Sequence, residues 1–133
     1  MEDVVDQLLQ EVAKCFQKYS TLTDEVLSGL AFVFQGTLLP ALSLVDSKSV
    51  TRLVSPSSRC LYEVRGSSGN VYMCFEGLNY CCCPSYTYSV LKRRDSMMCK
   101  HILAVRLSEA MQTCCTVNVQ DDDIATIIIN MDT

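Results

Sequence analysis

The chain has 133 residues, which is enough for one domain that removes about 70% of its unfolded surface from water. Its hydrophobic fraction of 49% and mean hydropathy of +0.19 are high for so short a chain, yet we expect no apolar run of the ~20 residues that a membrane span needs. The net charge of −4 and the pI of about 4.8 argue against a stand-alone nucleic-acid binder, because such binding depends on neutralising phosphates. We therefore expect a protein partner, rather than lipid or only a generous core, to cover the surplus apolar surface.

Residues 1–48 are predicted to form a helical N-terminal region. Apolar residues recur every three or four positions in 3–19, which predicts an amphipathic helix that serves either as a core helix or as a partner-binding helix. Thr23 is a good N-cap for a second helix that ends near Gly36, and a short third helix follows over 38–45. The region lacks the Gly-x-x-x-x-Gly-Lys phosphate loop, so any ATPase activity belongs to another chain.

From Ser49 onward the hydrophobic period becomes that of strands. Three strands are predicted, over 49–54, 60–65 and 70–76, and a glycine- and serine-rich hairpin loop over 66–69 joins the last two. Together with the helices, these strands predict an α+β fold with a small antiparallel sheet. Residues 49–115 are expected to form one zinc-finger domain on this sheet.

Four residues with zinc-binding side chains follow the predicted sheet as Cys81-x-Cys83 and, after a spacer of fifteen residues, Cys99-x-His101. His101 is the only histidine. Three thiolates and one imidazole can close a tetrahedral Zn²⁺ site, with Zn–S near ~2.3 Å and Zn–N near ~2.0 Å. Cys82 leaves the choice of ligand open, because a shift of register would let it replace a neighbour.

The spacing of each pair places its two side chains on one side. In extended or turning backbone, residues two apart point the same way, so Cys81 and Cys83 can face one ion. In a helix such residues lie roughly 200° apart, so Cys99 is expected just before a helix and His101 in its first turn. The result is a ββα-like zinc unit.

Other interpretations of the cysteines are a disulfide framework or ordinary buried thiols. We see no signal peptide, which favours a reducing compartment over disulfides, and the coincidence of two paired spacings with the lone histidine favours metal. Cys114 and Cys115 are expected to be buried thiols at the end of the helix. Four available ligands and no spare histidine as a base favour one structural zinc over a catalytic zinc, so the chain is not expected to be an enzyme.

Basic residues gather only around the predicted zinc site. Residues 59–113 carry seven basic and four acidic side chains, whereas residues 1–55 carry a net charge of −3. Lys92, Arg93, Arg94 and Lys100 are candidates for nucleic-acid contact, with nearby tyrosines available to stack on bases. In the alternative interpretation, the tyrosines pack on the zinc site and the cations form a solvated face.

The C-terminal region, 116–133, is predicted to hold a helix after Asp121. Ile124, Ile127, Ile128 and Met131 form an apolar stripe along it. Such a helix either docks on the domain or joins a partner, and the sequence favours neither.

The residues Cys81-Cys82-Cys83-Pro84 and Cys99-Lys100-His101-Ile102-Leu103-Ala104-Val105 resemble the signature of the SWIM zinc-finger family. The flanking residues and the short length resemble the SWIM subunit of Shu-type complexes. This resemblance implies a nuclear protein of homologous recombination. It would pair with a small recombinase-paralogue ATPase and promote assembly of the strand-exchange recombinase on single-stranded DNA. An independent nucleic-acid-binding zinc module is the alternative.

Overall fold

The computed structural model describes residues 2–66, 69–75, 80–81 and 99–130. Five α-helices, one 3-10 helix and five strands lie in these ranges. In chain order they are α1 (Glu2–Tyr19), α2 (Asp24–Phe34), η1 (Gln35–Thr37), α3 (Leu38–Asp46), β1 (Val50–Val54), β2 (Cys60–Arg65), β3 (Val71–Phe75), β4 (Tyr80–Cys81), α4 (Lys100–Met111), β5 (Cys115–Asn118) and α5 (Asp121–Asn130). The α+β prediction is confirmed, and the first three predicted helices and first three predicted strands agree with these bounds to within one or two residues.

The strands form one sheet in the order β4-β3-β2-β1-β5. The pairs β1–β2, β2–β3 and β3–β4 are antiparallel, whereas β5 runs parallel to β1 and places Leu53 beside Val117. The sheet is therefore mixed rather than wholly antiparallel. The chain adds β5 only after α4 has crossed the sheet, and such a crossover is how parallel neighbours are joined.

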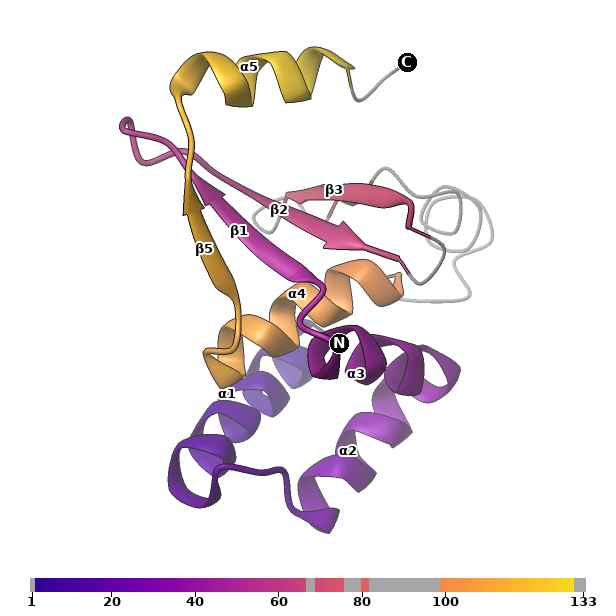
Figure 1. The fold of residues 1–133 in the computed structure, drawn as a ribbon. Helices are drawn as coiled ribbons and strands as arrows, with labels where there is room; N and C mark the ends of the chain where they lie inside the picture. The colour runs from indigo at the N-terminus through magenta and orange to yellow at the C-terminus, as the bar shows by residue number, and fades with distance from the viewer. Residues whose placement is uncertain (1, 67–68, 76–79, 82–98, 131–133) are drawn as a thin grey trace.

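One face of the sheet, the inner face, carries the main core (Figure 1). Helix α4 packs against this face and also contacts α1 and α3, so it is sandwiched between the sheet and the N-terminal helices. Leu103, Leu107, Val12 and Val64 are fully buried there. Two polar contacts join the layers: the Tyr62 hydroxyl of β2 donates to the Glu109 carboxylate, and Arg106 of α4 lies 2.9 Å from Asp6 of α1.

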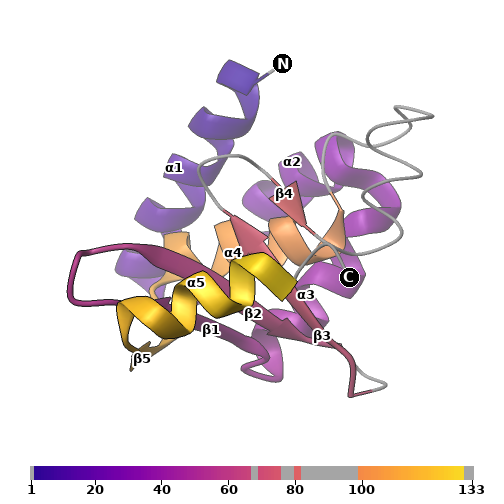
Figure 2. The same cartoon turned by 90° about the horizontal axis from the view of Figure 1, so that it is seen from above.

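The other face of the sheet, the outer face, has a much smaller buried cluster. Helix α5 lies on this side, away from α4 (Figures 1 and 2). The register partners Leu53 and Leu61 are buried, as is Ile124 of α5, and none of them belongs to the main core. The Asp121 carboxylate accepts a hydrogen bond from the Ser57 hydroxyl at 2.7 Å, which ties the start of α5 to the β1–β2 loop. Ile128 and Ile129 stay exposed.

The helical stretch Asp24–Asp46 is more apolar than the sequence analysis expected. It has 23 residues, and its most apolar 18 residues have a mean hydropathy of 1.6, so by length and composition it could cross a membrane. Only 22% of these most apolar residues are buried inside the protein. The stretch is not one straight helix, because Gln35 adopts a positive φ of 49° between α2 and α3. α3 also buries Leu38 and Ala41 in the main core.

Candidate metal centre

Cys99 and His101 lie where the sequence analysis expected them, at the start of α4. Cys99 is the N-cap residue, with extended backbone at φ −76° and ψ 167°, and α4 begins at Lys100. His101 is therefore in the first turn of the helix. The change from extended to helical backbone at Cys99 allows two side chains two positions apart to converge, which a continuous helix would prevent.

Both side chains are buried. Cys99 is 4% exposed and His101 is 3% exposed. The His101 ring packs on Tyr72 of β3, with ring centroids 4.2 Å apart and a 31° angle between the planes. This contact fixes the imidazole between α4 and the sheet. Nothing in the sequence distinguishes Tyr72, because its position in the second hairpin strand shows only strand periodicity.

The buried imidazole of His101 fits a metal ligand. Neither of its ring nitrogens has a hydrogen-bond partner among the described residues. A buried polar group without a partner costs about 1–3 kcal/mol, so native proteins rarely leave one in place. Bonding of one nitrogen to Zn²⁺ would satisfy it, and the buried thiol of Cys99, at a helix N-terminus that favours a thiolate, offers a second ligand.

Cys81, the third candidate ligand, ends the short edge strand β4. Its backbone pairs with Cys74 of β3, and α4 contacts both of these strands. The structure thus brings the strand that carries Cys81 to the helix that carries His101. Among the described residues, no group of three or more His, Cys, Asp or Glu side chains is arranged to hold a metal. The side chain of Cys81 and all of Cys82 and Cys83 lie outside those residues.

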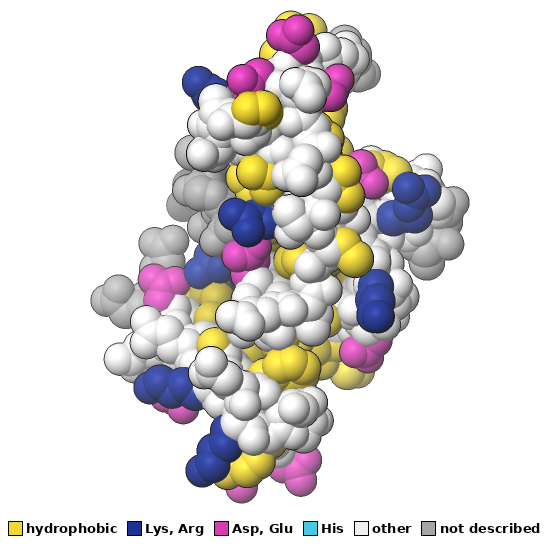
Figure 3. Space-filling view, turned by 60° about the vertical axis from the view of Figure 1, so that its left-hand side comes forward, with side chains coloured by type: hydrophobic (Ala, Val, Ile, Leu, Met, Phe, Trp, Pro, Cys, Tyr) yellow, Lys and Arg dark blue, Asp and Glu magenta, His cyan; other side chains and the backbone are white. Residues whose placement is uncertain are grey.

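The candidate nucleic-acid contacts are mostly outside the described residues. Lys92, Arg93 and Arg94 fall there, and only Lys100 is described. Its side chain is exposed at the first position of α4, beside the buried Cys99 and His101. The face drawn in Figure 3 shows acidic and basic side chains interspersed with hydrophobic ones from α5 down to the helical layer, and no continuous basic patch among its coloured residues.

Cys114 and Cys115 differ from each other in their surroundings. Cys114 is partly buried, and this burial, reinforced by the nearby Glu109 carboxylate, raises the pKa of its thiol to about 11. Its thiolate is therefore less accessible at neutral pH than that of an ordinary cysteine. Cys115 is exposed in β5, so the expectation that both thiols are buried was wrong for Cys115. Helix α4 ends earlier, and Gln112 adopts the left-handed conformation beyond it.

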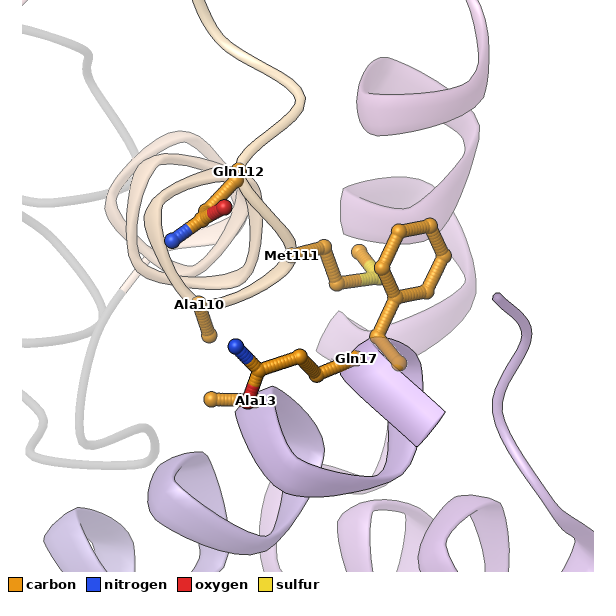
Figure 4. A pocket seen from close by; sticks show the side chains of 6 residues that line it. Ala13, Gln17, Ala110, Met111 and Gln112 are labelled. Atoms are coloured by element: carbon orange, nitrogen blue, oxygen red, sulfur yellow. The ribbon is translucent and has the colours of Figure 1, made fainter. Parts of the chain in front are cut away.

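The remaining described features do not form a catalytic constellation. The carboxylate of Glu109 accepts a hydrogen bond from Tyr62 and so joins α4 to β2. A cavity of about 80 Å³ lies between the ends of α1 and α4 (Figure 4). Its lining carries no titratable side chain and consists of Ala13, Phe16, Gln17, Ala110, Met111 and Gln112.

Comparison with known proteins identifies close relatives. No protein-family model matches the chain, and no solved structure matches it. Human zinc finger SWIM domain-containing protein 7 is 43% identical over 95% of this chain and 90% of its own length. The mouse and zebrafish proteins of that name are 40% and 42% identical, over 97% and 94% of this chain and 85% and 89% of their own lengths. A Dictyostelium discoideum homologue is 34% identical over 86% of this chain and 74% of its own length. The resemblance to SWIM zinc fingers is confirmed, and the chain belongs to the zinc finger SWIM domain-containing protein 7 family.

Proposed function

We propose that this chain is a non-catalytic zinc-finger subunit of a Shu-type homologous recombination complex in the nucleus. The observation that carries the proposal is the pair of buried side chains, Cys99 and His101, at the start of α4. The pair has the spacing of the second half of the SWIM signature, and the chain belongs to a SWIM family.

The proposed metal is one structural Zn²⁺ held by Cys81, Cys83, Cys99 and His101. Bound there, zinc would supply a closed tetrahedral centre that links the edge strand β4 to the first turn of α4. Structural zinc contributes about 10–16 kcal/mol of apparent binding free energy in small domains, which is comparable with the ~5–15 kcal/mol stability of a whole protein. The metal site would therefore determine whether this side of the domain is ordered enough to bind a partner.

The proposed partner is a small recombinase-paralogue ATPase. Together the two subunits would promote assembly of the strand-exchange recombinase on single-stranded DNA. The chain has no phosphate loop of its own, which fits a complex in which ATP is bound by the other subunit. DNA contact would then come mainly through the complex, because this chain is acidic overall.

The proposal is tested by affinity purification of tagged wild type and His101→Ala from cells at matched expression. Mass spectrometry then identifies the bound proteins. We expect the recombinase-paralogue ATPase to co-purify with the wild type and to be lost with the variant. Equal recovery with both proteins would separate partner binding from zinc, and absence of this ATPase from the wild-type sample would refute the proposed complex.

An independent nucleic-acid-binding module is the second candidate, favoured by the exposed Lys100 beside the buried ligand pair. An electrophoretic shift of single-stranded DNA by the purified chain alone distinguishes the two functions. Tight binding that weakens steeply with salt, as phosphate contacts require, would favour this second candidate. We expect weak binding by the chain alone.

A further inference from the structure

Between the two ends of the α2–η1–α3 segment, its outward side carries no charge. From Val26 to Val45 the sequence contains no Asp, Glu, Lys or Arg. Within this stretch exposed residues recur as pairs four positions apart, and we call six of them the outer stripe: Ala31, Phe32, Gln35, Gly36, Leu39 and Pro40. A surface helix normally presents charged and polar residues on its solvent side, so the outer stripe is not an ordinary solvated surface.

The outer stripe includes the most exposed large hydrophobic side chains among the described residues. Phe32 is 84% exposed and Leu39 is 75% exposed. They cannot turn inward, because the opposite side of the same helices is already occupied in the core by Leu30, Phe34 and Leu38. An exposed aromatic residue in a largely apolar, uncharged surface is typical of a site that a partner covers.

The charges at the two ends of the outer stripe indicate what kind of partner fits. Asp24 and Glu25 are exposed before it, and Asp46 is exposed after it, with the exposed Lys48 two residues further on. A helix that lies on an anionic membrane surface carries Lys and Arg instead. Crossing the membrane would require α3 to withdraw Leu38 and Ala41 from the main core. A second copy of the chain would bring acidic ends together, since residues 1–55 already have a net charge of −3.

We propose that the outer stripe is a docking site for a different protein chain, which presents an apolar strip with Lys or Arg side chains near its ends. The inference rests on the proposed function for the existence of a protein partner, and it adds where on this chain that partner binds. The surface lies on the N-terminal helices, whereas the proposed zinc ligands lie in β4, in α4 and in the segment between them.

Gly36 allows the outer stripe to be altered without disturbing the fold. A Cβ added at Gly36 meets no atom within 4 Å, and its φ is not in the left-handed region. Gly36→Glu therefore adds one negative charge to the stripe, and Gly36→Ala adds a methyl group without charge. Gln10→Glu adds the same charge at an exposed position of α1 and is the matched control.

The experiment is co-expression of each variant with the recombinase-paralogue ATPase, followed by measurement of the affinity of the purified, zinc-loaded proteins. We expect Gly36→Glu and Phe32→Ser to weaken the complex by at least about tenfold, while Gly36→Ala and Gln10→Glu stay within about twofold of wild type. Asp46→Lys is expected to weaken it by a smaller factor, through loss of attraction to the basic end of the partner.

The outcomes separate the docking site from the proposed function. If wild type binds and Gly36→Glu binds equally well, the docking site is wrong and the complex stands. If wild type fails to bind the ATPase, both are wrong. Two measurements on the chain alone test the other occupants: a dimer by light scattering that Gly36→Glu abolishes, or flotation with phosphatidylcholine vesicles that this variant abolishes, would overturn a heterologous protein as the occupant.

Discussion

The two faces of the sheet are covered in different ways. The inner face packs on α4, which is itself covered by α1 and α3, and every one of these elements contributes fully buried residues. The outer face is covered by α5 alone among the described helices, and α5 contributes one buried residue, Ile124. Stability in a protein is not uniform, and elements with few buried contacts open first. The inner face is thus expected to set global stability, and the outer face to form a weaker unit that opens independently.

The largest effect is expected from a cavity in the inner core. Leu103 of α4 is fully buried between the sheet and the N-terminal helices, so Leu103→Ala should lower the free energy of unfolding by about 2–5 kcal/mol. Urea denaturation followed by circular dichroism measures it. Leu42→Ala, at a partly buried position of α3, is the control and should cost less. A loss below about 1 kcal/mol for Leu103→Ala would contradict the role given to the inner core.

A smaller and local effect is expected on the outer face. Ile124→Ala removes the one buried side chain of α5, and the small cluster around it can partly collapse into the space. We therefore expect the free energy of unfolding of this unit to fall by about 2 kcal/mol, the lower end of the range for such a core substitution. Hydrogen exchange should become faster in α5 while α4 keeps its protection. Ile129→Ala, at a position 72% exposed, should change neither the stability nor the hydrogen exchange of α5. Equal loss of protection in α4 would show that the two faces unfold as one unit.

The ion pair between α1 and α4 should contribute less than either core residue. Arg106 and Asp6 lie 2.9 Å apart, with the Arg106 side chain 19% exposed and that of Asp6 56% exposed. A double-mutant cycle with Arg106→Gln and Asp6→Asn should give a coupling of roughly 0.5–1 kcal/mol that falls with added salt, because the pair is partly solvated. A coupling that is independent of salt would mean that solvent does not reach the pair.

The two adjacent cysteines after α4, Cys114 and Cys115, should react with an alkylating reagent at different rates. Burial raises the pKa of Cys114 from an ordinary 9.0 to about 11, so at pH 8 its reactive thiolate is about a hundredfold scarcer than in an unperturbed thiol. Iodoacetamide should label the exposed Cys115 first, as peptide mass spectrometry can resolve. Because the folded state disfavours the Cys114 thiolate, its stabilising contribution is full below pH 9 and is lost as the pH rises toward 11. Equal labelling of both thiols at pH 8 would contradict the burial of Cys114.

Much of the fold could be predicted from local sequence patterns. Thr23 accepts a hydrogen bond from the backbone of Val26 as the predicted N-cap, and the β2–β3 hairpin follows the predicted alternation. The sequence did not predict β5, because Cys115–Asn118 is short and all four residues are exposed. β5 pairs with β1 because the packing of α4 on the sheet places the following residues beside β1, and local sequence patterns do not contain this packing. The apolar length of Asp24–Asp46 was also missed, because scattered Ser, Thr and Gln interrupt its hydrophobic residues without adding charge.

Half of the candidate metal centre could be predicted in the same way. The Cys99-x-His101 spacing requires a helix start between the two residues, and the structure has it. The contact of His101 with Tyr72 could not be predicted, since it joins residues 29 positions apart through the packing of α4 on the sheet. The choice among Cys81, Cys82 and Cys83 stays a prediction, because residues two apart share a side only when the backbone there is extended.

The central claim is that Cys81, Cys83, Cys99 and His101 hold one structural zinc ion. X-ray absorption at the zinc edge, combined with elemental analysis of the purified wild-type chain, tests it most directly, and His101→Ala and Cys82→Ser serve as paired variants. The account predicts one zinc ion per chain, with three sulfur neighbours near ~2.3 Å and one nitrogen neighbour near ~2.0 Å. It also predicts the same spectrum for Cys82→Ser and loss of zinc for His101→Ala. A wild-type protein without zinc, a site with four sulfur neighbours, or full zinc occupancy in His101→Ala would contradict the account.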